Sequence, residues 1–275
     1  MRGAIAAALL ALGTLRAGPD QATDELALRA VRFYRADHRR TRVTVFLEIP
    51  WGLVQPADRS DRPPSYEVVF RLADSSGATL HTQSWRAPFP AAARQPGGCA
   101  VETVEFVIRA GRYRLEATVR DSGSGRESHA GLDLEGFDAA PTASDLLLSP
   151  GIRPVAAADT VPRSGELRRG SVLITASALL RLTPSRSTAF FLLEAYGPSD
   201  RAEEGSMVVS VRSPSGAPLL RFRPMEVRLQ PGGSVLRGQV NLAGLEPGRY
   251  LLAVSVTLPG RTVEREAEFL MERER

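Results

Sequence analysis

The sequence is poor in the residue types that usually carry catalysis or bind metals. Among its 275 residues there is no lysine, all 35 basic residues being arginine, and there are only three histidines and one cysteine. The single cysteine, Cys99, excludes an intrachain disulfide, and His38, His81 and His129 have no metal-ligand spacing. The absence of lysine also excludes the usual phosphate-binding loop. We therefore expect no metal site, no cofactor and no enzymatic activity.

Positive charge is in slight excess and is spread along the chain. The formal net charge is +4, but the arginines are interleaved with Asp and Glu, and the densest basic run is only Asp37–Arg42. A nucleic-acid-binding surface requires clustered basic residues. The sequence therefore predicts no nucleic-acid partner, and solvated strand faces account for the arginines.

The N-terminal residues have the layout of a secretory signal. Arg2 precedes an apolar run, Gly3–Leu15, and small and polar residues follow it. A membrane-spanning helix needs about 20 apolar residues, so this run is too short, although an uncleaved anchor is an alternative. We expect residues 1–22 to be a signal peptide. The mature protein is then periplasmic or extracellular, without a membrane span, and its expected partner is an envelope or surface protein.

A pattern recurs in the two halves of the chain. The segment Ala110–Asp121 reads AGRYRLEATVRD, and Pro247–Leu258 reads PGRYLLAVSVTL. Two shorter motifs recur in the same order, Ser76–Ala78 with Ser215–Ala217 and Gln95–Gly98 with Gln230–Gly233. Two copies of one domain are the simplest explanation.

Each half alternates apolar and polar residues with a period of two, as half-buried strands do. Turn signals rich in the 24 glycines and 20 prolines separate these short runs. The sequence thus predicts an all-β protein of two tandem Ig-like or fibronectin-III-like Greek-key sandwiches. The first occupies residues 23–138, the second occupies residues 167–275, and residues 139–166 form a linker.

Two features depart from this simple scheme. The run Val43–Pro50 alternates, but Phe46 lies on the same face as the polar Thr44 and Glu48. The expected linker is rich in Ala, Pro, Ser and Gly, yet it contains one apolar island, Asp145–Ser149. We expect this island to pack at the junction of the two domains.

Tyr113 and Tyr250 are candidates for a structural role. Each follows a Gly-Arg pair at the start of an alternating run, in the frame apolar-x-(Pro/Ala)-Gly-x-Tyr. In Ig-like sandwiches a tyrosine near the start of strand F turns its hydroxyl back to the backbone a few residues upstream. We expect both residues to form such tyrosine corners; the alternative is that they are ordinary aromatic core residues.

Trp51 is the candidate ligand-binding residue. It lies at the mouth of a long loop, where an exposed indole ring offers a stacking platform for a sugar or another partner; Trp85 is equally compatible with a core position. The primary expectation is a non-enzymatic exported structural or protein-interaction module. The alternative is a carbohydrate- or polymer-binding module that uses loop aromatics such as Trp51. A hydrolase with a site at the domain junction is a third hypothesis, for which the sequence offers no recognisable residue set.

Four segments resemble the β-rich exported region of bacterial GWxTD-domain-containing proteins: Val43–Pro50, Ser144–Ile152, Gly165–Ile174 and Phe190–Gly197. The sequence has no Gly-Trp-x-Thr-Asp, since Trp51 follows a proline and Trp85 follows a serine, so the eponymous module is absent. The resemblance implies a bacterial exported protein, and it carries no catalytic residue over to this chain.

Overall fold

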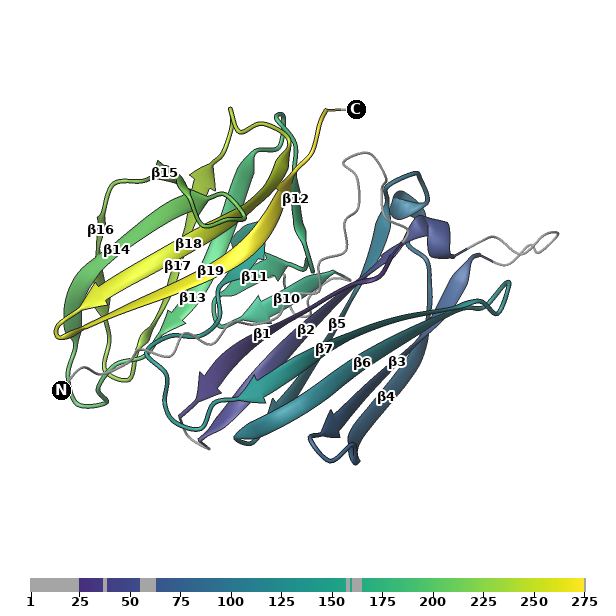
Figure 1. Ribbon diagram of the computed structural model, residues 1–275, viewed down its shortest axis with the longest axis horizontal. Helices are drawn as coiled ribbons and strands as arrows, with labels where there is room; N and C mark the ends of the chain where they lie inside the picture. The colour runs from purple at the N-terminus through teal and green to yellow at the C-terminus, as the bar shows by residue number, and fades with distance from the viewer. Residues whose placement is uncertain (1–24, 37–38, 55–62, 157–158, 160–164, 275) are drawn as a thin grey trace.

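The computed structural model describes residues 25–36, 39–54, 63–156, 159 and 165–274, and it consists of two β-sandwiches that lie side by side (Figure 1). Within these residues the only helices are two short 3₁₀ turns, Trp51–Leu53 and Ala91–Ala93. No helix among the described residues has the length and apolar character needed to cross a membrane.

The first sandwich consists of two antiparallel sheets. One has the strand order β1-β2-β5 and the other the order β4-β3-β6-β7. The strands are β1 (Ala27–Arg35), β2 (Arg40–Pro50), β3 (Ser65–Asp74), β4 (Thr79–Pro88), β5 (Cys99–Ile108), β6 (Gly111–Asp121) and β7 (Glu127–Gly136). The chain crosses between the sheets from β2 to β3, from β4 to β5 and from β5 to β6, so the connections are those of a Greek key.

The second sandwich repeats this order. Its smaller sheet is β17-β13-β8, and its larger sheet is β12-β19-β18-β14-β15, with β16 also paired to β14. The strands are β8 (Leu147–Ser149), β12 (Leu180–Leu182), β13 (Thr188–Ala195), β14 (Glu203–Arg212), β15 (Pro218–Arg221), β16 (Met225–Leu229), β17 (Ser234–Asn241), β18 (Gly248–Leu258) and β19 (Arg261–Met271). The prediction of an all-β protein with two tandem Ig-like sandwiches is confirmed.

The recurring sequence motifs form equivalent turns. In the turn between β3 and β4 the amide of Gly77 donates to the Asp74 carbonyl at 3.0 Å, and in the turn between β14 and β15 the amide of Gly216 donates to the Ser213 carbonyl at 2.9 Å. Gly77 has φ +85° and Gly216 has φ +86°, a left-handed conformation that favours glycine. The two Gln-Pro-Gly-Gly motifs likewise close with Gly98 donating to Gln95 and Gly233 donating to Gln230. The repeat therefore specifies the same turn hydrogen bonds twice.

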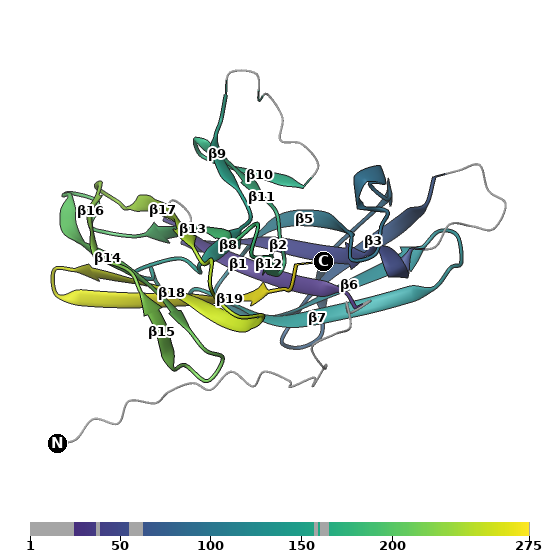
Figure 2. The same ribbon diagram turned by 90° about the horizontal axis from the view of Figure 1, so that it is seen from above.

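Between β8 and β12 the chain forms a small extra sheet, with the strand order β10-β11-β9. It consists of β9 (Ile152–Pro154), β10 (Glu166–Arg169) and β11 (Val172–Thr175), and it stands out from the two sandwiches in Figure 2. The segment 139–166, predicted as a linker, thus supplies β8, which pairs with β13 of the second sandwich.

Each sandwich has its own apolar core, and a third cluster joins them. Alternation explains the first two cores: in β6 the buried apolar residues are Leu115, Ala117 and Val119, and the residues between them, Glu116 and Thr118, are exposed or half-buried. Strand β2 differs, because Thr41 and the residues from Val43 to Ile49 are buried on both faces. A strand buried on both faces requires a second layer of structure over it, and that layer is the junction described next.

Candidate functional site at the junction of the two sandwiches

The junction has an apolar core that draws on both sandwiches and on the extra sheet. Strands β1 and β2 contribute from the first sandwich, β8 and β13 from the second, and β11 with the residues after it from the extra sheet. The buried members are Val31, Phe33, Phe46, Leu147, Val172, Ile174, Ala176, Ala178 and Leu192. Phe46, which breaks the polar pattern of its strand face, is fully buried here. The island Asp145–Ser149 supplies Leu147, while its neighbours Leu146 and Leu148 enter the core of the second sandwich.

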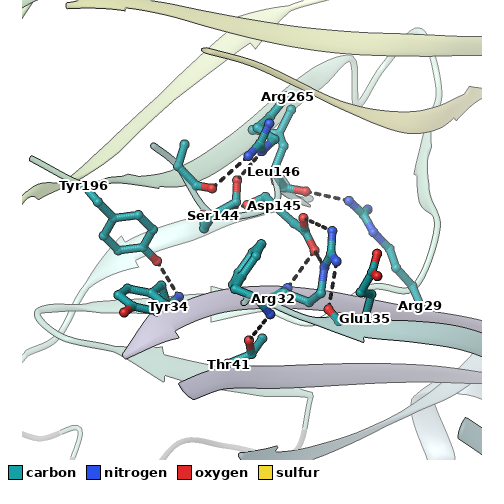
Figure 3. A network of polar contacts seen from close by, with 12 residues as sticks. Arg29, Arg32, Tyr34, Thr41, Glu135, Ser144, Asp145, Leu146, Tyr196 and Arg265 are labelled. Atoms are coloured by element: carbon teal, nitrogen blue, oxygen red, sulfur yellow. Dashed lines mark hydrogen bonds and ion pairs between the residues drawn. The ribbon is translucent and has the colours of Figure 1, made fainter. Parts of the chain in front are cut away.

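An ion pair between Arg32 of β1 and Asp145 lies at one side of this core (Figure 3). Arg32 Nε donates to Asp145 Oδ2 at 2.8 Å, and Arg32 Nη2 donates to Oδ1 at 3.0 Å. The backbone amide of Arg32 also donates to Oδ2 at 2.9 Å, and the amide of Asp145 donates to the Arg32 carbonyl at 3.0 Å. Hydrogen bonding to Asp145 raises the pKa of Arg32 above its usual value. The two residues therefore join the sandwiches through both backbone and side chains.

Two further arginines bind the backbone on either side of Asp145. Arg29 Nη2 donates to the Leu146 carbonyl at 2.7 Å. Arg265 Nε donates to the Ser144 carbonyl at 3.0 Å, and its Nη2 donates to the Ala143 carbonyl at 3.1 Å. Burial lowers the pKa of both guanidinium groups, and the nearby charge of Asp145 partly opposes this effect. Figure 3 shows these side chains converging on one short segment.

Glu48, near the C-terminal end of β2, makes a second polar connection across the junction. Its side chain is buried, and Oε1 accepts from Ser177 Oγ at 2.9 Å, from the Ala178 amide at 2.8 Å and from the Leu179 amide at 3.2 Å. These donors lie in the loop between β11 and β12. The carboxylate thus satisfies two backbone amides at the junction, which would otherwise lose hydrogen bonds on burial.

Arg169 of β10 contacts both sandwiches. Its side chain is 7% exposed, and its Nε donates to Glu194 Oε1 of the second sandwich at 3.1 Å. Its guanidinium carbon lies 3.7 Å from the centroid of the Phe33 ring in the first sandwich. Nη1 lies 3.7 Å from Glu105 Oε1, an ion pair that is too long for a hydrogen bond, and it has no hydrogen-bond partner among the described residues.

A tyrosine pair closes the junction near the end of β1. The amide of Tyr34 donates to the hydroxyl oxygen of Tyr196 at 2.7 Å, and that hydroxyl donates to Glu194 Oε2 at 2.9 Å. The two rings meet edge to face with centroids 5.9 Å apart. Burial, followed by the charge of Glu194, raises the pKa of Tyr196. Glu194 therefore links Tyr196 of the second sandwich to Arg169 of the extra sheet.

This arrangement is suited to holding the sandwiches together. The carboxylates of Asp145 and Glu194 accept from protein donors through both oxygens, and Glu48 accepts three hydrogen bonds through Oε1. Among the described residues no group of three or more His, Cys, Asp or Glu side chains has a geometry that could hold a metal ion. The site thus connects the two sandwiches and the extra sheet through buried apolar and polar contacts.

The two predicted tyrosines occupy equivalent positions. Tyr113 Oη donates to the Arg109 carbonyl at 3.2 Å, and Tyr250 Oη donates to the Glu246 carbonyl at 2.7 Å, each four residues upstream. Tyr113 pairs with Leu134 of β7 and Tyr250 pairs with Phe269 of β19, so both begin strand F of their sandwich. These are the hydrogen bonds of a tyrosine corner.

Trp51 is half-buried in the 3₁₀ turn after β2. Its ring packs against Phe89 with centroids 5.0 Å apart, and its amide donates to the Gly98 carbonyl at 2.9 Å. Trp85 lies elsewhere, on β4, where it stacks on Phe70 at 5.7 Å and donates from Nε1 to Glu102 Oε2 at 3.2 Å. The structure does not bring the two tryptophans together in one platform, and most of the loop after Trp51, residues 55–62, lies outside the described residues.

The remaining reactive residue types are separate from the junction core. Cys99 begins β5 as Ser234 begins β17, in agreement with a small residue at a strand start. Burial and the charge of Glu48 raise the pKa of the Cys99 thiol to about 11, so its reactive thiolate form is disfavoured. His81 lies on β4 and His129 on β7, and His38 lies outside the described residues.

Sequence reasoning did not find the residues that make the junction. Arg32, Glu48 and Arg169 belong to short polar-apolar runs that look like ordinary solvated strand faces. Two signals were available: Phe46, a large aromatic residue on a polar face, and the apolar island in the expected linker. Both pointed to a second packing surface without identifying what covers it.

No family model matches this chain, and no curated protein matches it. Two solved structures are similar over most of its length. The transglutaminase of red sea bream is 9% identical with a TM-score of 0.27, over 90% of this chain and 32% of that chain, so this chain spans about a third of that enzyme. A structure named BspA_C_WT is 10% identical with a TM-score of 0.22, over 85% of this chain and 93% of that chain. At these values neither likeness bears on activity.

Proposed function

We propose that this chain is a non-enzymatic, exported structural or protein-interaction module whose two Ig-like sandwiches act as one rigid unit. The observation that carries the proposal is the junction, where side chains from both sandwiches and the extra sheet form one buried cluster. Domains within a chain move relative to each other by default, unless their interface is large and hydrophobic. A continuous apolar core at the junction therefore favours a fixed geometry.

The polar residues of the junction support the same role. Arg32 and Asp145 make paired backbone and side-chain hydrogen bonds, and Glu48 accepts three hydrogen bonds from the opposite side. Directional bonds of this kind specify one orientation, whereas apolar packing alone tolerates sliding. A rigid pair of sandwiches presents its loops and sheet edges at a fixed spacing, which suits a scaffold or spacer that binds another protein.

Export is the second part of the proposal. The N-terminal pattern, with Arg2 before the apolar run Gly3–Leu15, supports it, and so does the resemblance to the exported region of GWxTD-domain-containing proteins. The proposed partner is an envelope or surface protein. Fractionation of cells that express the full chain is expected to recover a shortened protein, without about the first 22 residues, outside the cytoplasm. Recovery of the full-length chain in the cytosol alone would refute export.

Rigidity is tested by a distance measurement between the two sandwiches. Ser75→Cys and Pro214→Cys place spin labels at equivalent exposed turns, one in each sandwich, in a Cys99→Ser background. Double electron–electron resonance is expected to give one narrow distance distribution. Adding Arg169→Ala, which removes the bond to Glu194 and the stacking on Phe33, is expected to broaden it. A distribution that is already broad in the parent protein would exclude a rigid module.

A further inference from the structure

Three of the six large apolar side chains that are exposed among the described residues lie together at one edge of the second sandwich. Leu219 is 47% exposed, Leu220 is 40% exposed and Met225 is 43% exposed. Phe222, between them in the sequence, is half-buried and packs against the core of the second sandwich. We call these four residues the edge patch. Adjacent large apolar side chains on a protein surface mark binding sites, whereas scattered single ones do not.

The pairing with β14 makes the edge patch continuous. Three of its residues lie beside successive core-facing residues of β14: Leu220 beside Val211, Phe222 beside Val209 and Met225 beside Met207. The three residues of β14 are buried and share one face of the strand, because side chains alternate with a period of two. The patch therefore extends a row of the core outward to β15 and β16, the last strands at this edge of the sheet.

The equivalent edge of the first sandwich is polar. Leu80 of β4 and Leu219 of β15 occupy the same place, since each follows the recurring Ser-Gly-Ala turn and each is skipped in the pairing register. The two core-facing positions that follow are polar in β4 and apolar in β15, His81 and Gln83 against Leu220 and Phe222. The repeated fold thus forms this edge without an apolar patch, so the patch in the second copy is not needed to build the sandwich.

Arginines without partners flank the edge patch. Arg221 and Arg223 are exposed, and neither has a hydrogen-bond or ion-pair partner among the described residues. The run Pro218–Met225 contains no acidic residue, and the nearest one in the sequence is Glu226. The edge therefore combines apolar side chains with positive charge that no neighbouring carboxylate in this run neutralises.

We propose that the edge patch docks on the surface of a bilayer that contains anionic phospholipids. The apolar side chains enter the boundary between headgroups and acyl chains, and Arg221 and Arg223 bind the lipid phosphates. The long aliphatic part of each arginine side chain allows its guanidinium group to reach the headgroups while the strand lies at this boundary. Figure 2 shows β15 extending from the second sandwich on the side opposite the extra sheet.

The charge and shape of this edge favour a bilayer over other occupants. A second copy docked through a two-fold axis would bring the same arginines together, and like charges across an interface oppose association. A protein partner would need a groove that matches a projecting strand, whereas a fluid lipid surface needs no matched shape. The docking depends neither on the proposed rigidity nor on export, so its failure leaves the proposed function intact.

Cosedimentation with lipid vesicles tests the docking. The chain from residue 23 onward is used, because it lacks the apolar run Gly3–Leu15, which would itself bind lipid, and retains every strand of both sandwiches. We expect binding to phosphatidylcholine vesicles that contain about 30% phosphatidylglycerol, and binding about tenfold weaker or less to pure phosphatidylcholine. Added salt should weaken the binding to the anionic vesicles, because it screens the arginines.

Matched substitutions on the two edges test the location. Arg221→Gln should weaken binding to the anionic vesicles about fivefold, the effect of one arginine near an anionic surface. Leu219→Ser should weaken it about tenfold, through loss of inserted apolar area. The controls are Arg86→Gln and Leu80→Ser, which remove the same groups from the equivalent strand β4 and should bind like the parent.

Several results would overturn the proposal. They are absence of binding to the anionic vesicles, equal binding to both kinds of vesicle, and equal losses in the β4 and β15 variants while their circular dichroism is unchanged. A concentration-dependent dimer in analytical ultracentrifugation that Leu219→Ser dissociates would also overturn it, because the patch would then be an interface between copies of the chain.

Discussion

The ion pair between Arg32 and Asp145 is expected to couple the two sandwiches energetically. The perturbation is a double-mutant cycle of Arg32→Ala, Asp145→Ala and the double variant. Removal of Asp145 leaves the backbone amide of Arg32 and two N–H donors of its guanidinium group, Nε and Nη2, without their acceptor. Removal of Arg32 also deletes its bond to the Glu135 carbonyl at 2.9 Å. The double-mutant cycle separates the interaction free energy between the two side chains from the other losses of stability that each substitution causes.

The expected loss of unfolding free energy can be estimated from the exposure of the two side chains. The side chains are 30% and 24% exposed, so the pair lies between a surface salt bridge and a fully buried one. Surface pairs contribute about 0–1 kcal/mol, and removal of one member of a buried pair costs about 3–5 kcal/mol. We expect each single variant to lower the free energy of unfolding by about 3 kcal/mol, and the coupling energy to be about 2 kcal/mol.

Urea unfolding monitored by two signals is the assay. Both tryptophans, Trp51 and Trp85, lie in the first sandwich, so their fluorescence follows that sandwich alone, whereas far-ultraviolet circular dichroism follows both. Coincident transitions in the parent protein indicate that the sandwiches unfold together. In the Arg32 and Asp145 variants the two transitions should separate, because the junction no longer holds the sandwiches in one cooperative unit.

The matched control is the pair of Arg212 and Glu264, which has two hydrogen bonds of 2.7 Å but lies within one sheet of the second sandwich. Its cycle should give at most about 1 kcal/mol, and it should leave the two transitions coincident. A coupling energy below about 0.5 kcal/mol for Arg32 and Asp145, or a control that separates the transitions equally well, would refute the reasoning.

Two further predictions concern the residues that the sequence singled out. Tyr113→Phe and Tyr250→Phe should each lower the free energy of unfolding by about 1 kcal/mol, the net value of one hydrogen bond, with the larger loss at Tyr250, whose bond is 0.5 Å shorter (3.2 Å against 2.7 Å). A urea midpoint that does not move in either variant contradicts the tyrosine corner. Trp51→Ala should lower stability by about 2 kcal/mol through loss of packing on Phe89 and should leave retention on polysaccharide columns unchanged. Loss of retention with an unchanged melting temperature would instead favour the polymer-binding alternative.

Much of each sandwich was predictable because it rests on local rules. Period-two alternation marks strands such as β6 and β18 without knowledge of their partners, since one face of each meets its own core. The turns around Gly77 and Gly216 recur because glycine supplies the same left-handed conformation in both. The two tyrosine corners need only a partner four residues upstream, so a short motif contains both ends of the hydrogen bond.

The candidate site was not predictable in the same way. Arg32 and Asp145 are separated by 113 positions, and Glu48 and Ala178 by 130, so no local pattern contains both members of either contact. An arginine on an alternating strand looks the same whether water or another domain lies over it. Phe46 and the apolar island Asp145–Ser149 did depart from their surroundings, because large apolar side chains on a polar face or in a polar linker need other residues to cover them.

The sequence by itself determined that the chain forms two copies of one β-sandwich, through alternation, turn glycines and a repeated Gly-Arg-Tyr. Only the tertiary structure decided that the expected linker supplies a strand to the second sandwich, and that the outer faces of β2 and β13 meet in a shared core. The physical reason is the separation in sequence of the residues that interact. Strand periodicity and turns depend on neighbours within a few residues, whereas a shared core depends on which distant surfaces come into contact.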